Sequence, residues 1–344
     1  PIIGASLLLA IPGHSFIVSK RYVQLSAPAR KQALTLRSIP DGVSFDSIAP
    51  EITSEATEAL NTAKVAAQEA GKAILASCGK MGSKTKFNEK DLVTEVDVAC
   101  QKIVEDHLES GGWTAKGHTI LGEEAVAPGM AASAAALNEA MGLDGSGKDT
   151  KKLGGWMWVV DPIDGTTNFV MGMPLSAISI GICYEGRVVA ACIYDPFQKE
   201  MFTAVAGQGA MINNEPMGVG TEENLVQAVL AAGAPPSLAS LQPSLRGINA
   251  LAPKVRTVRL IGSAAIMLAW VACGRHTLYF EPDLNSWDIA AGALLVHEAG
   301  GKITDLDGTP YKLTTRAILA SNSRTHDETL SILQSVNAIR CDEI

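Results

Sequence analysis

The chain has 344 residues, of which 47% are apolar and 19% charged, and its formal net charge is −8. This composition is typical of a core-forming globular chain with one large layered domain or two smaller ones, and it excludes a disordered protein. The acidic balance argues against a non-specific nucleic-acid binder, because that class needs an excess of Lys and Arg on one face.

The start of the chain differs in charge from the rest. Residues 1–40 contain no Asp or Glu, and residues 1–50 carry a net charge of +3, which leaves −11 for the remainder. An apolar run from Ile2 to Ile11 is too short to span a bilayer. A basic, acid-free leader is typical of an organelle transit peptide. We therefore expect residues 1–50 to direct the protein to an organelle, a plastid rather than a mitochondrion. The alternatives are a secretory signal and an ordinary disordered tail on a cytoplasmic protein.

Helical periodicity begins after this leader. Small apolar residues recur at helical spacing over residues 54–79, and Thr94 opens a capping pattern that predicts a helix to about Glu109. A strand is predicted at residues 119–122. Residues 125–155 are rich in Ala and Gly, so we expect a surface insertion with one loose helix.

Strands dominate the pattern that follows. Antiparallel strands, two of them joined by a tight turn at Glu185-Gly186, are predicted at residues 158–161, 176–184, 187–194 and 199–205. After about Val219 strands alternate with helices. These strands are expected at 226–231, 256–260, 277–281, 302–305 and 318–320, and the helices at 263–273, 285–299 and 325–338. The sequence thus predicts an α+β half over residues 51–218 and an α/β half over residues 219–344.

The most informative segment is the string WVVDPIDGTTNF, which begins at Trp158. A strand of Val residues runs to Asp161, and we expect Pro162 to end it before a polar turn that contains Asp164. A D-x-x-D pattern by itself is usually no more than a polar connecting turn. Within the whole string, two carboxylates that follow a buried strand can converge on one hard cation such as Mg²⁺, which prefers oxygen ligands.

The same turn can hold a phosphate group. Gly165 lets the backbone approach a ligand closely. If a helical turn begins at Thr166, its free N–H groups would bind the phosphate oxygens.

Further acids follow or flank other predicted apolar segments. Glu123 and Glu124 come directly after a strand, and Asp288 opens an apolar helix. Taken singly, these are explained as a solvated loop and an N-cap. Several carboxylates in one cleft would repel one another unless cations neutralised them. The combination indicates magnesium-assisted phosphoryl transfer to water.

These three segments resemble the signatures of the inositol monophosphatase family, within the magnesium-dependent, lithium-sensitive superfamily of sugar and polyol phosphatases. The similarity runs from about Ser54 to Ala338, interrupted by residues 125–155. It implies the layered αβαβα sandwich of the inositol monophosphatase and fructose-1,6-bisphosphatase type, of class α+β and α/β. The resemblance also implies a homodimer.

The resemblance also implies roles for single residues. Thr166, assisted by Asp97 and with Glu123 as a third catalytic residue, would orient the attacking water. The phosphate would be bound by the N–H groups of Gly165 and Thr166 and by Lys86. Two to three Mg²⁺ ions would be held by Glu123, Glu124, Asp161, the carbonyl of Ile163, Asp164 and Asp288. The substrate would be contacted by Asp164, Gly262, Ser263, Ala264, Glu281 and Asp288.

The expected substrate is a small phosphorylated polyol, myo-inositol monophosphate above all. Glu281 lies seven residues before Asp288. Its carboxylate can accept hydrogen bonds from hydroxyl groups and would repel a second phosphate. No nucleic acid or membrane partner is expected. The alternatives are a related phosphatase acting on L-galactose 1-phosphate, histidinol phosphate, a nucleotide 3′-phosphate or a sugar bisphosphate, and an inactive scaffold subunit that keeps the fold.

Overall fold

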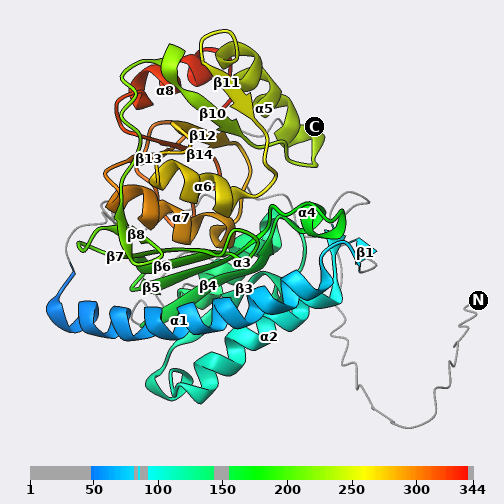
Figure 1. Ribbon diagram of the computed structural model, residues 1–344, viewed down its shortest axis with the longest axis vertical. Helices are drawn as coiled ribbons and strands as arrows, with labels where there is room; N and C mark the ends of the chain where they lie inside the picture. The colour runs from blue at the N-terminus through cyan, green and yellow to red at the C-terminus, as the bar shows by residue number, and fades with distance from the viewer. Residues whose placement is uncertain (1–47, 81–83, 86–91, 143–154, 340–344) are drawn as a thin grey trace, which may run out of the picture. The chain divides into compact units, whose positions relative to one another are not determined.

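Helices and sheets alternate in the computed structural model, which describes residues 48–80, 84–85, 92–142 and 155–339. Two sheets lie between three layers of helices, in the order αβαβα (Figure 1). This arrangement confirms the predicted sandwich. None of the described helices is long and apolar enough to cross a membrane. The leader prediction falls mainly on residues 1–47, outside the described part, and it stays a prediction, as does the division at 218/219.

The first layer consists of α1 (Pro50–Ser77) and α2 (Glu95–Ser110), which pack together and against the first sheet. Pro50 at the first turn favours the start of α1. Fully buried alanines repeat along α1 and let the helix approach the sheet closely. The capping box predicted at Thr94 is present at the start of α2, with Asp97 as its partner.

The first sheet has seven strands in the order β3-β4-β5-β6-β7-β8-β9, and only β3 and β4 pair in parallel. Helices cover both of its faces, so its central strands are almost continuously buried. The turn at Glu185-Gly186 is confirmed, with φ of 49° and 76° at the two residues. The strands are β3 (Thr119–Gly122), β4 (Trp156–Asp164), β5 (Ala177–Tyr184), β6 (Arg187–Asp195), β7 (Glu200–Val205), β8 (Ala210–Ile212) and β9 (Glu215–Met217).

The prediction that Pro162 ends the fourth strand is wrong. Strand β4 continues to Asp164, and its pairing with β5 shifts register between Asp161 and Asp164. Asp161 pairs with Ser179 and Asp164 with Ala177, so two residues of β4 stand opposite one residue of β5. This β-bulge accommodates a proline, which has no N–H to donate to the ladder.

The middle layer consists of α6 (Ala264–Ala272) and α7 (Ser286–Glu298), which lie between the two sheets (Figure 1). Both helices are buried around almost their whole circumference, as expected for helices covered on two sides. A Cβ added to Gly181 on β5 would lie 2.8 Å from the Cβ of Ala290 on α7. The glycine therefore sets how closely α7 approaches the sheet.

The second sheet has the order β11-β10-β12-β14-β13. Its first three strands are parallel and β14 is antiparallel to both of its neighbours, so this half is mixed. Helices α5 (Leu238–Leu251) and α8 (His326–Ser335) pack together beside it and form the last layer. The strands are β10 (Val229–Ala232), β11 (Thr257–Arg259), β12 (Leu278–Glu281), β13 (Lys302–Asp305) and β14 (Ile318–Ser321).

Some elements were not expected from the sequence. Helix α5 was missed because Pro243 lies inside it. The short hairpin of β8 and β9 turns at Asn213-Asn214, where both residues have positive φ. Other small elements are the ribbon of β1 (Lys84–Thr85) and β2 (Leu92–Val93) and 3₁₀ turns at Thr114–Lys116, Glu123–Ala125 and Leu225–Gln227. Helix α4 (Thr166–Val170), by contrast, begins at the residue where the sequence suggested a helical turn.

The described part of the insertion contains one helix, as predicted, but that helix is not loose. Helix α3 (Met130–Ala140) packs beside β3. Leu137 and the following Met141 are buried in the core shared with the middle layer. Residues 143–154 lie outside the described part.

Gly181→Ala is expected to lower the free energy of unfolding by about 1–3 kcal/mol, because the added methyl group meets Ala290 and the backbone of Ala291. Urea unfolding measures the change. Gly218→Ala is the matched control, since its Cβ would lie 3.6 Å from the Ala299 carbonyl oxygen, an ordinary contact. Equal stability of the two variants would contradict this account of the packing.

Candidate active site

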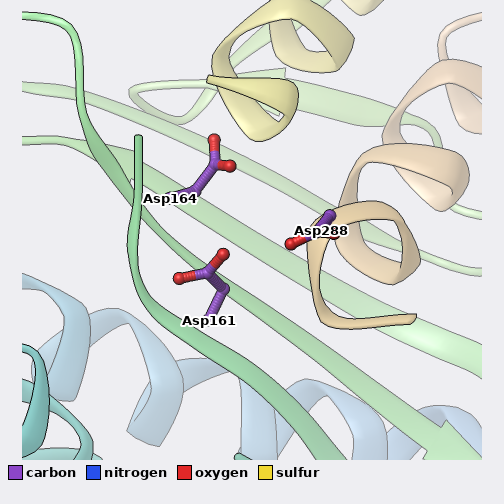
Figure 2. A group of neighbouring side chains, drawn as sticks. All are labelled: Asp161, Asp164 and Asp288. Atoms are coloured by element: carbon purple, nitrogen blue, oxygen red, sulfur yellow. The ribbon is translucent and has the colours of Figure 1, made fainter. Parts of the chain in front are cut away.

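Three carboxylates meet where β4 ends and α7 begins. Asp161 and Asp164 come from the bulged end of β4, and Asp288 is the third residue of α7. One ligand oxygen from each lies within 4.8 Å of the others. Asp161 and Asp164 are buried and Asp288 is half-buried. Figure 2 shows the Asp288 carboxylate directed toward the strand that carries the other two.

The bulge explains how two acids three residues apart share one side of a strand. Side chains in a regular strand alternate between faces, so residues i and i+3 point to opposite sides. The extra residue in β4 reverses the alternation, and Asp161 and Asp164 both pair with residues on the α7 side of β5. Ile163 faces the α1 side, and its N–H donates to Asp161 Oδ1 over 3.0 Å.

Asp164 joins the two halves of the fold. The Ser263 hydroxyl donates to its Oδ2, and the first N–H groups of α6 donate to the same carboxylate, from Ala264 to Oδ1 over 3.2 Å and from Ala265 to Oδ2 over 2.8 Å. Burial raises the pKa of Asp164 to about 6, and the charge of Glu123 adds to this, while these hydrogen bonds oppose it. A helix N-terminus stabilises the anionic form of such a group.

Asp288 belongs to the cap of its own helix. The Asn285 N–H donates to Asp288 Oδ2 over 2.6 Å, and the Asp288 N–H donates to the Asn285 carbonyl over 3.2 Å. Burial raises the pKa of Asp288 well above its usual value, and the charges of Glu123 and Asp164 raise it further. Buried acids that repel one another are relieved by a cation. The all-oxygen donor set fits a hard divalent ion such as Mg²⁺.

The two neighbouring glutamates have different surroundings. Glu123 lines the same pocket as the three aspartates, and its charge acts on Asp164 and Asp288. Glu124 is not among the described residues that line this pocket, and its N–H donates to Gln101 Oε1 over 2.9 Å. The structure therefore brings Glu123, rather than Glu124, to the pocket.

Thr166 and Asp97 are brought together from different elements. Thr166 Oγ1 donates to the Ile163 carbonyl over 3.2 Å and to Asp97 Oδ1 over 3.4 Å. The other oxygen of the buried Asp97 accepts from the N–H and hydroxyl of Thr94, over 2.8 and 2.5 Å. The capping box of α2 thus holds the Asp97 carboxyl group beside the Thr166 hydroxyl.

Gly165 could not be replaced without strain. Its φ is +92°, and a Cβ there would lie 2.9 Å from the Leu175 carbonyl oxygen. Helix α4 begins directly after it, as predicted at Thr166. Lys86, the other predicted phosphate ligand, lies outside the described residues.

A pocket of about 600 Å³ surrounds the acidic cluster and is lined from both halves of the fold. Gly262, Ser263, Ala264 and Glu281, all predicted to contact the substrate, line it. The Tyr279 hydroxyl donates to Glu281 Oε2 over 2.5 Å. Burial raises the pKa of Glu281 to about 8.

Several residues at this site were not predicted from the sequence. Helix α3 and the residue before it contribute Gly129, Met130 and Ser133 to the pocket wall, so the insertion borders the site. The Asn168 amide donates to the carbonyls of Leu175 and Ile261, over 2.8 Å each, and ties α4 to the second half. Only the position of Asn168, inside the recognised string, was a usable signal.

Known proteins are similar to this chain over most of the layered region. A family model described as the inositol monophosphatase family matches residues 55–338. Inositol monophosphatase 2 of Solanum lycopersicum is 38% identical over 246 residues, which cover 71% of this chain and 85% of that protein. Nus factor SuhB of Pseudomonas aeruginosa is 35% identical over 280 residues, 80% of this chain and 95% of that protein. The solved structure of inositol monophosphatase from Anabaena is similar with a TM-score of 0.65 and 31% identity, covering 81% of this chain and 96% of that chain.

Without divalent ions, we expect stability to fall as the pH rises from 6.5 to 8. The folded pKa of Glu281, about 8, lies above its unfolded value, so the folded state keeps a proton that the unfolded state has lost. The window lies above the range of His276 and His326, whose pKa values are lowered to about 4 by burial.

Urea unfolding at both pH values, with a chelator present, measures this fall. One such group contributes up to about 2 kcal/mol over this window. Glu281→Gln should make the fall smaller, whereas Glu215→Gln, at an exposed position of β9, should leave it unchanged. A fall as steep in Glu281→Gln as in the wild type would contradict the assignment.

Proposed function

Because the chain belongs to the inositol monophosphatase family and is a phosphoric monoester hydrolase, we propose that it hydrolyses myo-inositol monophosphate to inositol and phosphate with Mg²⁺. The observation that carries the proposal is the convergence of Asp161, Asp164 and Asp288 in one pocket. A pocket with these acids would repel a phosphate ester. A cation bound between them would turn that repulsion into attraction.

The residues that would hold the ions are those whose oxygens face the pocket. We assign two to three Mg²⁺ ions to Asp161, Asp164, Asp288, Glu123 and the Ile163 carbonyl, with Glu124 nearby. When bound there, Mg²⁺ supplies Lewis-acid polarisation of the phosphoryl oxygens and lowers the pKa of a water ligand.

Thr166 and Asp97 would orient the attacking water. Because the Thr166 hydroxyl donates its proton toward Asp97 and the Ile163 carbonyl, its oxygen lone pairs remain able to accept a hydrogen bond from water. Asp97 is fixed by the cap of α2, and this fixes the orientation in which the Thr166 oxygen accepts from water. The phosphate would be bound by the N–H groups of Gly165 and Thr166, and by Lys86.

The alcohol portion would face the second half of the fold. Glu281 and Ser263 both line the pocket from the second half, and the Glu281 carboxyl group can hydrogen-bond to hydroxyl groups of a polyol. Among the described residues that line the pocket, a second phosphate on the substrate would meet further acids, with Arg316 as the one basic side chain. This lining favours a polyol monophosphate over a bisphosphate.

The second candidate function is a further role as a scaffold subunit, beside hydrolysis. It rests on the similarity to a protein named Nus factor SuhB. L-galactose 1-phosphate, histidinol phosphate and nucleotide phosphates remain alternatives for the substrate. Homodimerisation and a plastid location are further proposals from the sequence alone.

Asp161→Asn is expected to lower Mg²⁺-dependent phosphate release by at least about 100-fold, because a neutral amide is a poor ligand for a hard cation. The half-saturating Mg²⁺ concentration should rise as well. Asp327→Asn is the control, since this exposed aspartate pairs with Lys302 away from the pocket. Full activity in Asp161→Asn would contradict the metal assignment.

A phosphate-release panel with Mg²⁺ tests the substrate. It contains inositol 1-phosphate, L-galactose 1-phosphate, histidinol phosphate, fructose 1,6-bisphosphate and 3′-phosphoadenosine 5′-phosphate. We expect the highest kcat/KM for inositol 1-phosphate. A higher value for another compound would replace the proposed substrate, and no release from any of them would contradict the proposed class of substrate.

A further inference from the structure

The loop of residues 282–285 sets the position of Asp288. It connects Glu281, at the end of β12, to α7, in which Asp288 is the third residue. Asp161 and Asp164 stand on a different sheet, so their spacing to Asp288 depends on how this loop delivers α7. A shift of the loop would separate the three carboxylates.

Arg316, just before β14, holds three consecutive residues of this loop. Its Nη2 donates to Asp283 Oδ1 over 2.7 Å, and its Nη1 donates to Asn285 Oδ1 over 2.8 Å. Its carbonyl accepts the N–H of Leu284 over 2.8 Å. The planar guanidinium is suited to such paired acceptors, because its donors point in fixed directions.

The contact with Asn285 leads directly to the acidic cluster. Asn285 is the N-cap of α7, and its backbone N–H and carbonyl both bond to Asp288. From α5, Ser240 Oγ donates to the remaining oxygen of Asp283 over 2.6 Å. The loop is thus held on both sides, and Arg316 reaches Asp288 through one intermediate residue.

Arg316 is a cationic side chain in a pocket that is otherwise rich in acids. Among the described residues that line the pocket, it is the one with a cationic side chain. By Coulomb repulsion alone, it would weaken the binding of a divalent ion at the neighbouring acids. A residue that acted only through its charge would therefore oppose the proposed metal site.

On the basis of the proposed metal-dependent function, we propose that Arg316 is a positioning residue that holds the 282–285 loop, and through Asn285 the carboxylate of Asp288, in the geometry that binds the divalent ion. A positioning role and a purely repulsive charge predict opposite changes in cation affinity. Removing the guanidinium should weaken cation binding, whereas removal of a merely repulsive charge would strengthen it.

The test is isothermal titration of Mn²⁺ and Mg²⁺ into the full chain, without substrate. Arg316→Gln should raise Kd about 10-fold or more, the scale seen when partners of metal ligands are removed. The Arg316→Lys variant should bind the ions with intermediate affinity. Its single ammonium group cannot donate to two acceptors with the fixed geometry of the guanidinium. Arg246→Gln is the matched control, since Arg246 bonds to the Asn337 carbonyl outside the pocket.

A double variant tests the route through Asn285. If Arg316 acts through Asn285, Arg316→Gln should weaken Mn²⁺ binding much less in an Asn285→Ala background than in the wild type. Kinetics should show a raised half-saturating Mg²⁺ with a smaller change in kcat at saturating Mg²⁺. Urea unfolding in chelator checks that each variant is folded.

The outcomes separate this inference from the proposed function. Unchanged or tighter cation binding in Arg316→Gln, additive effects in the double variant, or wild-type binding in Arg316→Lys would overturn the positioning role, whatever the activity. If the wild type bound Mn²⁺ but released no phosphate, the proposed function would fail. The positioning role would then still be decided by the titrations.

Discussion

The active-site geometry depends on one extra residue in strand β4. In a regular strand, Asp161 and Asp164 would point to opposite faces of the sheet, and only one could meet Asp288. The bulge at Pro162 and Ile163 turns both acids toward the middle helices. Asp164 then receives the N-terminus of α6, and α7 delivers Asp288 beside it.

This arrangement concentrates negative charge in a buried place, and the surrounding structure compensates for only part of it. Helix N–H groups and the Ser263 hydroxyl support Asp164, and the cap of α7 supports Asp288. The pKa values of both aspartates are still raised by burial and by neighbouring acids. The remaining electrostatic repulsion is what a divalent cation would relieve, so affinity for a metal and for a phosphate ester have the same origin.

The pocket is built from both halves of the fold. Its floor is the acidic cluster, and its walls come from α3, the start of α4, the first turn of α6 and the loop before α7. The insertion, which resembles a surface appendage in composition, is anchored in the core by Leu137 and reaches the pocket with Met130. Arg316 holds the 282–285 loop before α7 through Asp283 and Asn285.

Local patterns alone predicted much of this protein. The helix after Thr94 and the turn at Glu185-Gly186 were predictable because caps and turns depend on a few adjacent residues. Local patterns failed at two prolines, because a β-bulge accommodates Pro162 and helix α5 contains Pro243. The clamp by Arg316 and the wall formed by α3 were decided only by the tertiary structure. Each joins side chains that are distant in the sequence, and only chain folding and packing set such distances.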